Sequence, residues 1–270
     1  MSAPRLPSVT GELRFHELKS AVFRNTRLLR VWVPPGYGEP LNAARQYPVL
    51  YLNDGQNLFQ SETSFAGVEW QVDETADQLV REGKISPLII VGMDHAGKNR
   101  MKEYVPYRCF SPPILRPQGR RYPDFLVDEV MPFIGRNYRV ATGAENTGLG
   151  GSSLGGLIAL YTTMVRPGMV GRLLIESPSL FMGGRQLLKE ARGFRRWPER
   201  VYMGIGTRES GGPDRDQAFV NDVIRLAQNM KEAGLGDDRL RINIAEGAAH
   251  SEGEWAKRLP GAMEFLFRPS

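Results

Sequence analysis

The stretch Asn146-Thr-Gly-Leu-Gly-Gly-Ser-Ser-Leu-Gly-Gly-Leu-Ile-Ala-Leu160 decides the fold of this chain. Within it, Gly151-x-Ser153-x-Gly155 fits the pattern G-x-S-x-G, which is common by chance when it stands alone. Here a short strand-like segment precedes the pattern and an apolar helical segment, 157–164, follows it. Strand, turn and helix in that order predict a nucleophile elbow, a sharp turn that holds a serine in a strained backbone conformation. The alternative is a Gly-Ser-rich loop that leads into a helix.

Two adjacent serines lie in this turn, and only Ser153 has glycines two residues before and two residues after it. Glycines at these places let neighbouring backbone approach without a Cβ clash. The N-terminus of the following helix favours the negative charge that develops when the hydroxyl reacts. The pattern therefore predicts Ser153, rather than Ser152, as a nucleophile.

A serine hydroxyl needs a neighbouring base, usually a histidine. The chain has three: His16 in an N-terminal edge strand, His95 after the fourth expected strand, and His250 after the last one. A triad of this kind runs serine, acid, histidine along the chain, and only His250 follows Ser153. We therefore expect His250 to be the base, with His95 as a distant second choice.

The acid that orients the histidine should leave the sheet between the serine and the histidine. Glu209 stands just beyond the strand-like run 201–205 and a glycine turn, and is our first choice. Asp214 and Asp216 are close competitors, although they fit the first turn of the next helix, where acids stabilise the helix dipole.

Two backbone N–H groups should complete such a site by binding the oxyanion. One is expected from Leu154, directly after the nucleophile. The other is expected from Gln56 or Gly55, in the turn that follows the apolar run 49–52. An ordinary strand-to-helix turn explains that second segment equally well.

Strand-like and helical segments alternate along the rest of the chain, which predicts an α/β fold with a mainly parallel sheet covered on both faces. The expected strands are 13–18, 28–33, 49–52, 88–91, 173–175, 201–205 and 240–244. The first two lack a helix between them and should form an antiparallel edge pair. Helices are expected over 125–134, where Pro132 should kink or shorten the helix, over 157–164 and over 218–230.

Length and composition agree with a soluble globular protein of one domain spanning residues 1–270. Hydrophobic residues make up 41% and charged residues 24% of the 270 residues. The single cysteine, Cys109, cannot form an internal disulfide and is expected to be a packed loop residue. No apolar run approaches membrane-spanning length, and residues 1–10 lack the apolar centre of a signal peptide, so we expect a cytoplasmic protein with no membrane partner.

The net charge of +5 is concentrated in residues 94–121, which hold seven basic residues against two acidic ones. No nucleic-acid-binding module accompanies them, so we expect no nucleic-acid partner. The segment is also too long for an ordinary connection, which suggests a functional loop or lid beside a site for an acidic or polar substrate. A solvated loop, with the part 100–104 held by its own ion pairs, is the alternative.

Four segments together resemble the putative esterase family, the α/β-hydrolase branch of esterase D, enterobactin esterases, feruloyl and acetyl-xylan esterases, and mycolyltransferases. They are residues 49–59, 150–156, 176–181 and 206–209, and the resemblance covers roughly residues 12–267. It implies the α/β-hydrolase fold, with Ser153 as nucleophile, Glu209 as acid, His250 as base and the amides of Gln56 and Leu154 in the oxyanion hole. It also implies that 177–179 lie beside the site and that Phe181 lines a substrate pocket.

Two features depart from the family pattern. Relatives that cleave S-formylglutathione carry a His-Gly pair and cysteines where this chain has Asn53-Asp54-Gly55, which argues against that substrate. Gly148 and Gly150 replace larger residues in the elbow strand, which we expect to be weakly packed.

The sequence thus predicts a serine carboxylic-ester hydrolase that acts on a small-molecule ester through an acyl-enzyme. The alternatives are an acyltransferase on the same scaffold and a non-catalytic binding protein. No metal site, phosphate loop or other cofactor site is expected. Candidate substrate-binding residues are Asp54, Arg100, Tyr104 and Phe181. The sequence identifies neither the ester nor the oligomeric state.

Overall fold

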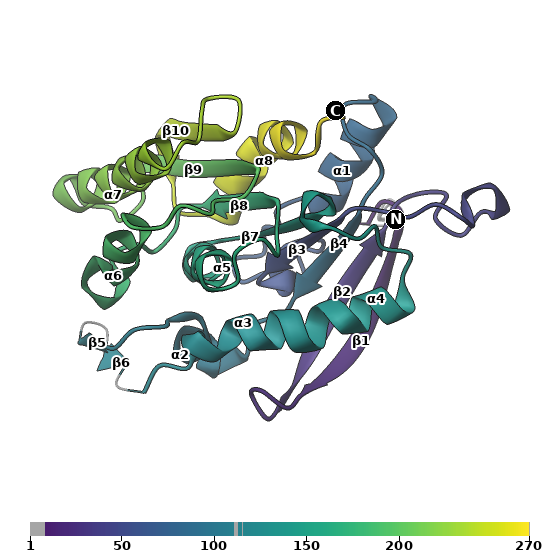
Figure 1. The fold of residues 1–270 in the computed structure, drawn as a ribbon, viewed down its shortest axis with the longest axis horizontal. Helices are drawn as coiled ribbons and strands as arrows, with labels where there is room; N and C mark the ends of the chain where they lie inside the picture. Colours follow the sequence, from purple (N-terminus) through teal and green to yellow (C-terminus); the bar gives the residue numbers. More distant parts are fainter. Residues whose placement is uncertain (1–8, 111–112, 115, 270) are drawn as a thin grey trace, which may run out of the picture.

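A computed structural model describes residues 9–110, 113–114 and 116–269, which form one eight-stranded sheet with helices on both faces (Figure 1). In pairing order the strands are β1 (Glu12–Ser20), β2 (Asn25–Val33), β4 (Ile89–Met93), β3 (Val49–Asn53), β7 (Thr147–Ser152), β8 (Arg172–Glu176), β9 (Arg200–Arg208) and β10 (Leu240–Ala249). Most of residues 1–10, where no signal peptide is expected, lies outside the described residues.

The sheet is parallel from β4 through β10, and β1 and β2 add an antiparallel pair at one edge. This arrangement confirms the predicted mainly parallel sheet and its antiparallel edge pair. The central strands β3 and β4 are buried along their whole length, as expected for apolar strands covered on both faces. All the parallel strands point the same way, so their carboxyl ends meet along one edge of the sheet.

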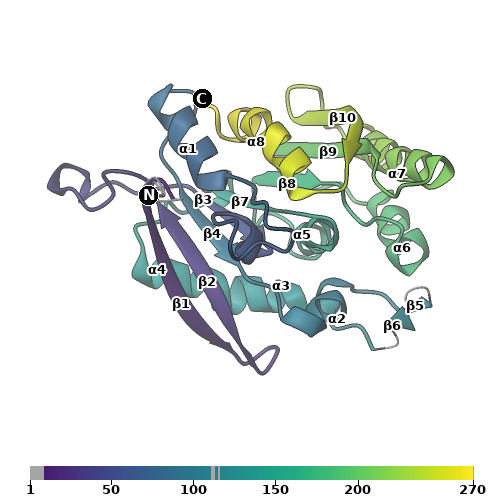
Figure 2. The same cartoon turned by 180° about the vertical axis from the view of Figure 1, so that it is seen from behind.

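Helices cover the two faces unequally (Figures 1 and 2). One face carries α1 (Val72–Arg81) and α8 (Glu252–Phe267). The other carries α5 (Leu154–Val165), α6 (Met182–Ala191), α7 (Pro213–Glu232) and a composite helix of α3 (Tyr122–Asp124), a π-helical stretch (Phe125–Val130) and α4 (Met131–Asn137). Each face therefore has its own hydrophobic core.

The composite helix corrects one expectation. Pro132 does not shorten the helix, which runs on to Asn137, beyond the expected end at 134. Just before the proline, the Met131 N–H bonds to the Leu126 carbonyl, five residues back, in the wide turn of a π-helix. A proline ring would otherwise clash with the carbonyl four residues before it, and the wider turn accommodates it.

The elbow strand β7 is closely packed, so the expectation of weak packing at its glycines is wrong. A Cβ at Gly148 would come within 2.9 Å of the Leu50 side chain, and one at Gly150 within 2.6 Å of the Leu174 carbonyl oxygen. These glycines allow the neighbouring strands and their side chains to come close, and this is why larger residues are absent.

The basic segment 94–121 has more structure than expected. It contains the short helix α2 (Arg100–Tyr104) and a small hairpin of β5 (Cys109–Phe110) and β6 (Pro113–Ile114), while residues 111, 112 and 115 lie outside the described part. Cys109 is buried, as predicted. The ion pairs of α2 do not stay within the segment: Arg100 pairs with Asp54, and Glu103 pairs with the buried Arg27.

Candidate active site

The polar residues singled out in the sequence gather at the carboxyl edge of the sheet. Asp54 follows β3, His95 lies two residues beyond β4, Ser153 follows β7, Glu209 follows β9 and His250 follows β10. Open α/β sheets bind their ligands in the crevice outside these strand ends. The topology alone therefore brings together residues that are up to about two hundred positions apart in the chain.

Ser153 stands in a nucleophile-elbow conformation between β7 and α5. Its φ of 55° and ψ of −123° are unusual for a residue with a side chain. A Cβ at Gly151 would lie 2.8 Å from the carbonyl carbon of Gly155, and a Cβ at Gly155 would lie 3.0 Å from the Asn53 Cβ. The turn is thus so tight that both glycines of the G-x-S-x-G pattern are required by their surroundings.

His250 and Glu209 contact each other directly, with His250 Nδ1 2.5 Å from Glu209 Oε2. The sheet register explains the contact, because Ala249 pairs with Arg208 and the next residue of each strand is His250 and Glu209. A bulge between Ala245 and Ala249 shifts this end of β10 into place.

Glu209 is held by three further groups. The Ser177 hydroxyl donates to Oε1 at 2.7 Å, the Gly206 N–H donates to the same oxygen at 2.6 Å, and the Trp255 indole N–H donates to Ser177 Oγ at 2.9 Å. Burial alone would raise the pKa of Glu209, but the hydrogen bonds from His250, Ser177 and Gly206 outweigh it and hold the pKa below its ordinary value. The carboxyl is therefore an oriented anion beneath a partly exposed imidazole.

The Ser153 hydroxyl has a different partner in this structure. Its Oγ lies 3.3 Å from Ser179 Oγ, and among the described residues no hydrogen bond joins it to His250. Both Ser153 and His250 nevertheless line the same cavity. Ser177 and Ser179 thus each contact a predicted catalytic residue. This agrees with the family resemblance, which implies that residues 177–179 lie beside the site.

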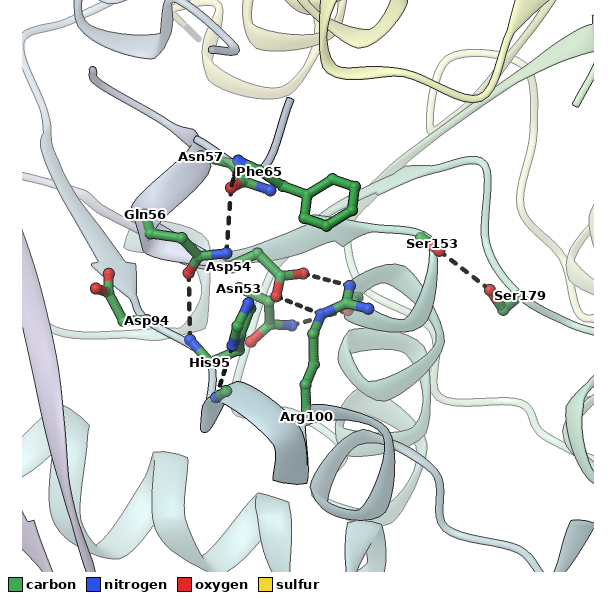
Figure 3. A network of polar contacts seen from close by, with 12 residues as sticks. Asn53, Asp54, Gln56, Asn57, Phe65, Asp94, His95, Arg100, Ser153 and Ser179 are labelled. Atoms are coloured by element: carbon green, nitrogen blue, oxygen red, sulfur yellow. Dashed lines mark hydrogen bonds and ion pairs between the residues drawn. The ribbon is translucent and has the colours of Figure 1, made fainter. Parts of the chain in front are cut away.

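Arg100 also lines this cavity, and it pairs with the buried Asp54 (Figure 3). Arg100 Nε and one terminal nitrogen each lie 2.7 Å from a carboxylate oxygen of Asp54, in a bidentate pair. Asp54 has a left-handed backbone, with φ of 60°, directly before the turn Gly55–Asn57. The N–H groups of Gln56 and Leu154 face no backbone acceptor among the described residues.

A cavity of about 510 Å³ joins these groups. The residues that line it come from four segments of the chain: Gln56, Asn57, Phe65, Ala66, His95, Gly97, Arg100, Ser152, Ser153, His250, Ser251, Glu252 and Trp255. This volume suits a small organic molecule.

Two candidate substrate-binding residues lie elsewhere. Tyr104 is fully buried in the core behind Arg100, and Phe181 stacks on Phe219 of α7 at 4.9 Å between ring centroids, so neither lines the cavity. Asp54 is buried and bound to Arg100, which leaves Arg100 alone facing the cavity.

Sequence reasoning did not find the aromatic residues of the cleft. Phe65, on the loop between β3 and α1, is 90% exposed at the cavity. Trp255, on α8, packs edge-on against the His250 ring at 5.0 Å. Trp255 lies five residues after His250, and no local pattern marks either aromatic residue as part of the cleft.

Comparisons with known proteins agree with this geometry. A sequence profile of the family described as "Putative esterase" matches residues 20–266. The uncharacterized protein YbbA of Bacillus subtilis (strain 168) is 24% identical over 252 residues, which cover 89% of this chain and 92% of YbbA. An endo-1,4-beta-xylanase/feruloyl esterase of Xylanibacter ruminicola is 27% identical over 240 residues, which cover 88% of this chain and 29% of that protein.

A similar solved structure is the IroE-like serine hydrolase from Shewanella oneidensis. It superposes with a TM-score of 0.72 at 23% identity, over 95% of this chain and 80% of that one. Among the residues described here, no helix is both long enough and apolar enough to cross a membrane. The fold is that of the α/β-hydrolases, the profile spans nearly the whole chain, and the chain accordingly belongs to the putative esterase family and is a carboxylic ester hydrolase.

Proposed function

We propose that Ser153, His250 and Glu209 form a catalytic triad that hydrolyses a small-molecule carboxylic ester through an acyl-enzyme. The observation that carries this proposal is the His250–Glu209 contact at the edge of the cavity in which Ser153 occupies the elbow. The name of one structural neighbour, a serine hydrolase, agrees with it.

In the first half-reaction, the Ser153 hydroxyl turns from Ser179 toward His250. Such hydrogen bonds are often formed only when substrate is bound. His250 takes the hydroxyl proton as Ser153 Oγ bonds to the ester carbonyl carbon. The N–H groups of Leu154 and Gln56 then stabilise the oxyanion. The bond to the alcohol oxygen breaks, the alcohol leaves with the proton from His250, and the acyl group stays on Ser153.

In the second half-reaction, water takes the place of the alcohol. His250 removes a proton from the water as its oxygen bonds to the acyl carbon, and then returns a proton to Ser153 as the acid leaves. Glu209 fixes the tautomer in which Nδ1 carries hydrogen, so Nε2 is free to accept the proton of the serine or the water. It also offsets the imidazolium charge in both steps.

Partitioning of the acyl group between two acceptors tests this mechanism. Phenyl acetate and p-nitrophenyl acetate would be hydrolysed in water that contains a fixed amount of methanol. A common acetyl-enzyme predicts the same ratio of methyl acetate to acetate from both esters. A ratio that depends on the leaving group would rule out a shared intermediate. A ratio far above the molar ratio of methanol to water would identify an acyltransferase.

A further inference from the structure

His95 lines the same cavity as His250 and takes no part in the proposed triad; Figure 3 shows it beside Gln56. It lies two residues beyond β4. Its backbone N–H donates to Gln56 Oε1 at 3.3 Å, which connects it to the turn Gly55–Asn57. Gln56 also supplies a proposed oxyanion N–H. The backbone of His95 is therefore anchored to the turn that carries the proposed oxyanion N–H.

The backbone determines which ring nitrogen of His95 carries hydrogen. The Gly97 N–H donates to His95 Nδ1 at 2.8 Å, so Nδ1 presents its lone pair. In a neutral imidazole the hydrogen is then on Nε2. Burial lowers the pKa of His95 below its ordinary value, although Asp54 opposes the shift, so the ring is neutral near pH 7. Among the described residues, the hydrogen bond found for the ring is the one at Nδ1, so Nε2–H is left without a hydrogen-bond acceptor.

The charges around the cavity indicate which kind of acceptor can bind the Nε2–H of His95. Arg100 is the one arginine or lysine among the described residues that line the cavity, and Asp54 occupies it with both carboxylate oxygens. Glu252 also lines the cavity, and its Oε1 accepts from the Asn57 amide at 3.0 Å rather than from a cation. An anionic group on the substrate would thus lie near the Arg100 guanidinium, which Asp54 already neutralises, and near the Glu252 carboxylate, which would repel it.

From this arrangement we infer that His95 is a specificity-determining residue, whose Nε2–H donates to an uncharged ether, hydroxyl or carbonyl oxygen on the ester. The inference rests on the proposed function and names the substrate class: uncharged, oxygen-bearing esters. Of the two expectations for the basic segment 94–121, an acidic or a polar substrate, it favours the polar one. Of its seven basic residues, only Arg100 lines the cavity, and its charge is already paired.

Two substitutions distinguish the loss of the Nε2–H donor from a disturbance of the local structure around His95. His95→Asn keeps an oxygen near the place of Nδ1, where it can accept from Gly97, but its side chain is too short to place a donor at Nε2. His95→Gln has an amide nitrogen that reaches the Nε2 position. Both would be assayed on matched p-nitrophenyl esters: methoxyacetate against butyrate, 3-methoxypropanoate against pentanoate, and 4-methoxybutanoate against hexanoate. On the alcohol side, 4-methoxyphenyl acetate would be compared with 4-ethylphenyl acetate.

For each pair the readout is the ratio of kcat/KM for the ether ester to kcat/KM for the alkyl ester. The intrinsic reactivity of each ester is the same with every variant, so it cancels when the ratio is compared between variants. At one oxygen position or more, we expect the ratio to fall about 2- to 10-fold in His95→Asn, the range for one neutral hydrogen bond, and to be retained in His95→Gln. The wild type should also prefer p-nitrophenyl methyl succinate to the anionic p-nitrophenyl hemisuccinate.

The outcomes distinguish this inference from the proposed function. Ratios that are the same in all three proteins at every oxygen position, or a preference for the hemisuccinate, would overturn the role of His95 while leaving the esterase mechanism intact. A folded wild type that hydrolyses none of these esters would overturn the proposed function, and the inference with it.

Discussion

His250 Nδ1 lies 2.5 Å from Glu209 Oε2, and this contact follows from the pairing of Ala249 with Arg208 in the preceding strands. The carboxylate is in turn bound by Ser177, and Ser177 by Trp255 of α8. A chain of hydrogen bonds therefore runs from a helix of one layer, through the sheet edge, to the imidazole. The orientation of His250 depends on this whole chain and not on Glu209 alone.

Glu209→Gln should lower kcat by about 10³-fold with little change in KM, because the amide can no longer hold the required tautomer of His250. Steady-state hydrolysis of p-nitrophenyl acetate measures the effect. Asp214→Asn is the matched control, since Asp214 is exposed in the first turn of α7. Equal losses in the two variants, or activity retained in Glu209→Gln, would show that Glu209 is not the orienting acid.

Asp54→Asn and Arg100→Gln should each lower kcat by about 10-fold, less than the roughly 10²- to 10³-fold cost of removing an oxyanion donor outright. The reason is that the bidentate pair anchors a left-handed residue directly before the turn that carries the Gln56 N–H. Arg100→Lys should restore part of the loss. Lys98→Gln, an exposed neighbour, should have no effect. A change in KM alone would assign the pair to substrate binding instead.

Two glycine substitutions should have opposite effects on stability. Gly155→Ala would place a Cβ 2.8 Å from Asp54 Oδ2, and such overpacking costs about 1–3 kcal/mol. Gly261→Ala, within α8 and with nothing within 4 Å of the added Cβ, should stabilise the protein by about 0.5–1 kcal/mol. Urea unfolding measures both free energies. A Gly155→Ala variant as stable as the wild type would contradict the close packing described at Gly155, and a destabilised Gly261→Ala variant would contradict the open space at that position.

The free energy of unfolding should fall as the pH rises from 5 to 8. Burial, together with the neighbouring Glu74, raises the pKa of Asp73 to about 8, against an ordinary value of about 4. Over this interval the folded protein keeps a proton that the unfolded chain releases, so rising pH favours unfolding. Burial also raises the pKa of Glu69 to about 7, which adds to the same trend.

Asp73→Asn should reduce this pH dependence, because the amide imitates the protonated carboxyl and can still accept from the Thr10 N–H. Thermal unfolding at pH 5 and pH 8 measures the change. Asp237→Asn is the control, since its lowered pKa leaves it ionised throughout the interval. If Asp73→Asn kept the full pH dependence, the proton would have to reside on another group.

Much of this architecture could be predicted because periodic patterns and short motifs reflect local physics. The apolar runs at 49–52 and 88–91 became fully buried strands, and the glycines around Ser153 were required by contacts across the turn. The order of Ser153, Glu209 and His250 along the chain was enough to predict that they approach one another at one sheet edge. The apolar runs and the glycine pattern each lie within about fifteen residues of sequence.

The remaining features depend on contacts between distant segments. Arg100 lies in a basic stretch, yet its partner is Asp54, 46 residues earlier. The buried pair of Glu176 and Arg258 joins residues 82 positions apart. Nothing near Phe65 or Trp255 in the sequence marks them as cleft residues. For the same reason the substrate region was only partly predicted, since Tyr104 and Phe181 face the core while Phe65 faces the cavity.

The central claim is that Ser153 is an activated nucleophile served by His250. Labelling with a fluorophosphonate, followed by mass mapping of the modified residue, tests it most directly. We expect a single label on Ser153, lost in Ser153→Ala and at least about 10²-fold slower in His250→Ala, in step with loss of p-nitrophenyl butyrate hydrolysis. A label on another residue, or a folded wild-type protein that neither labels nor hydrolyses the ester, would contradict the account.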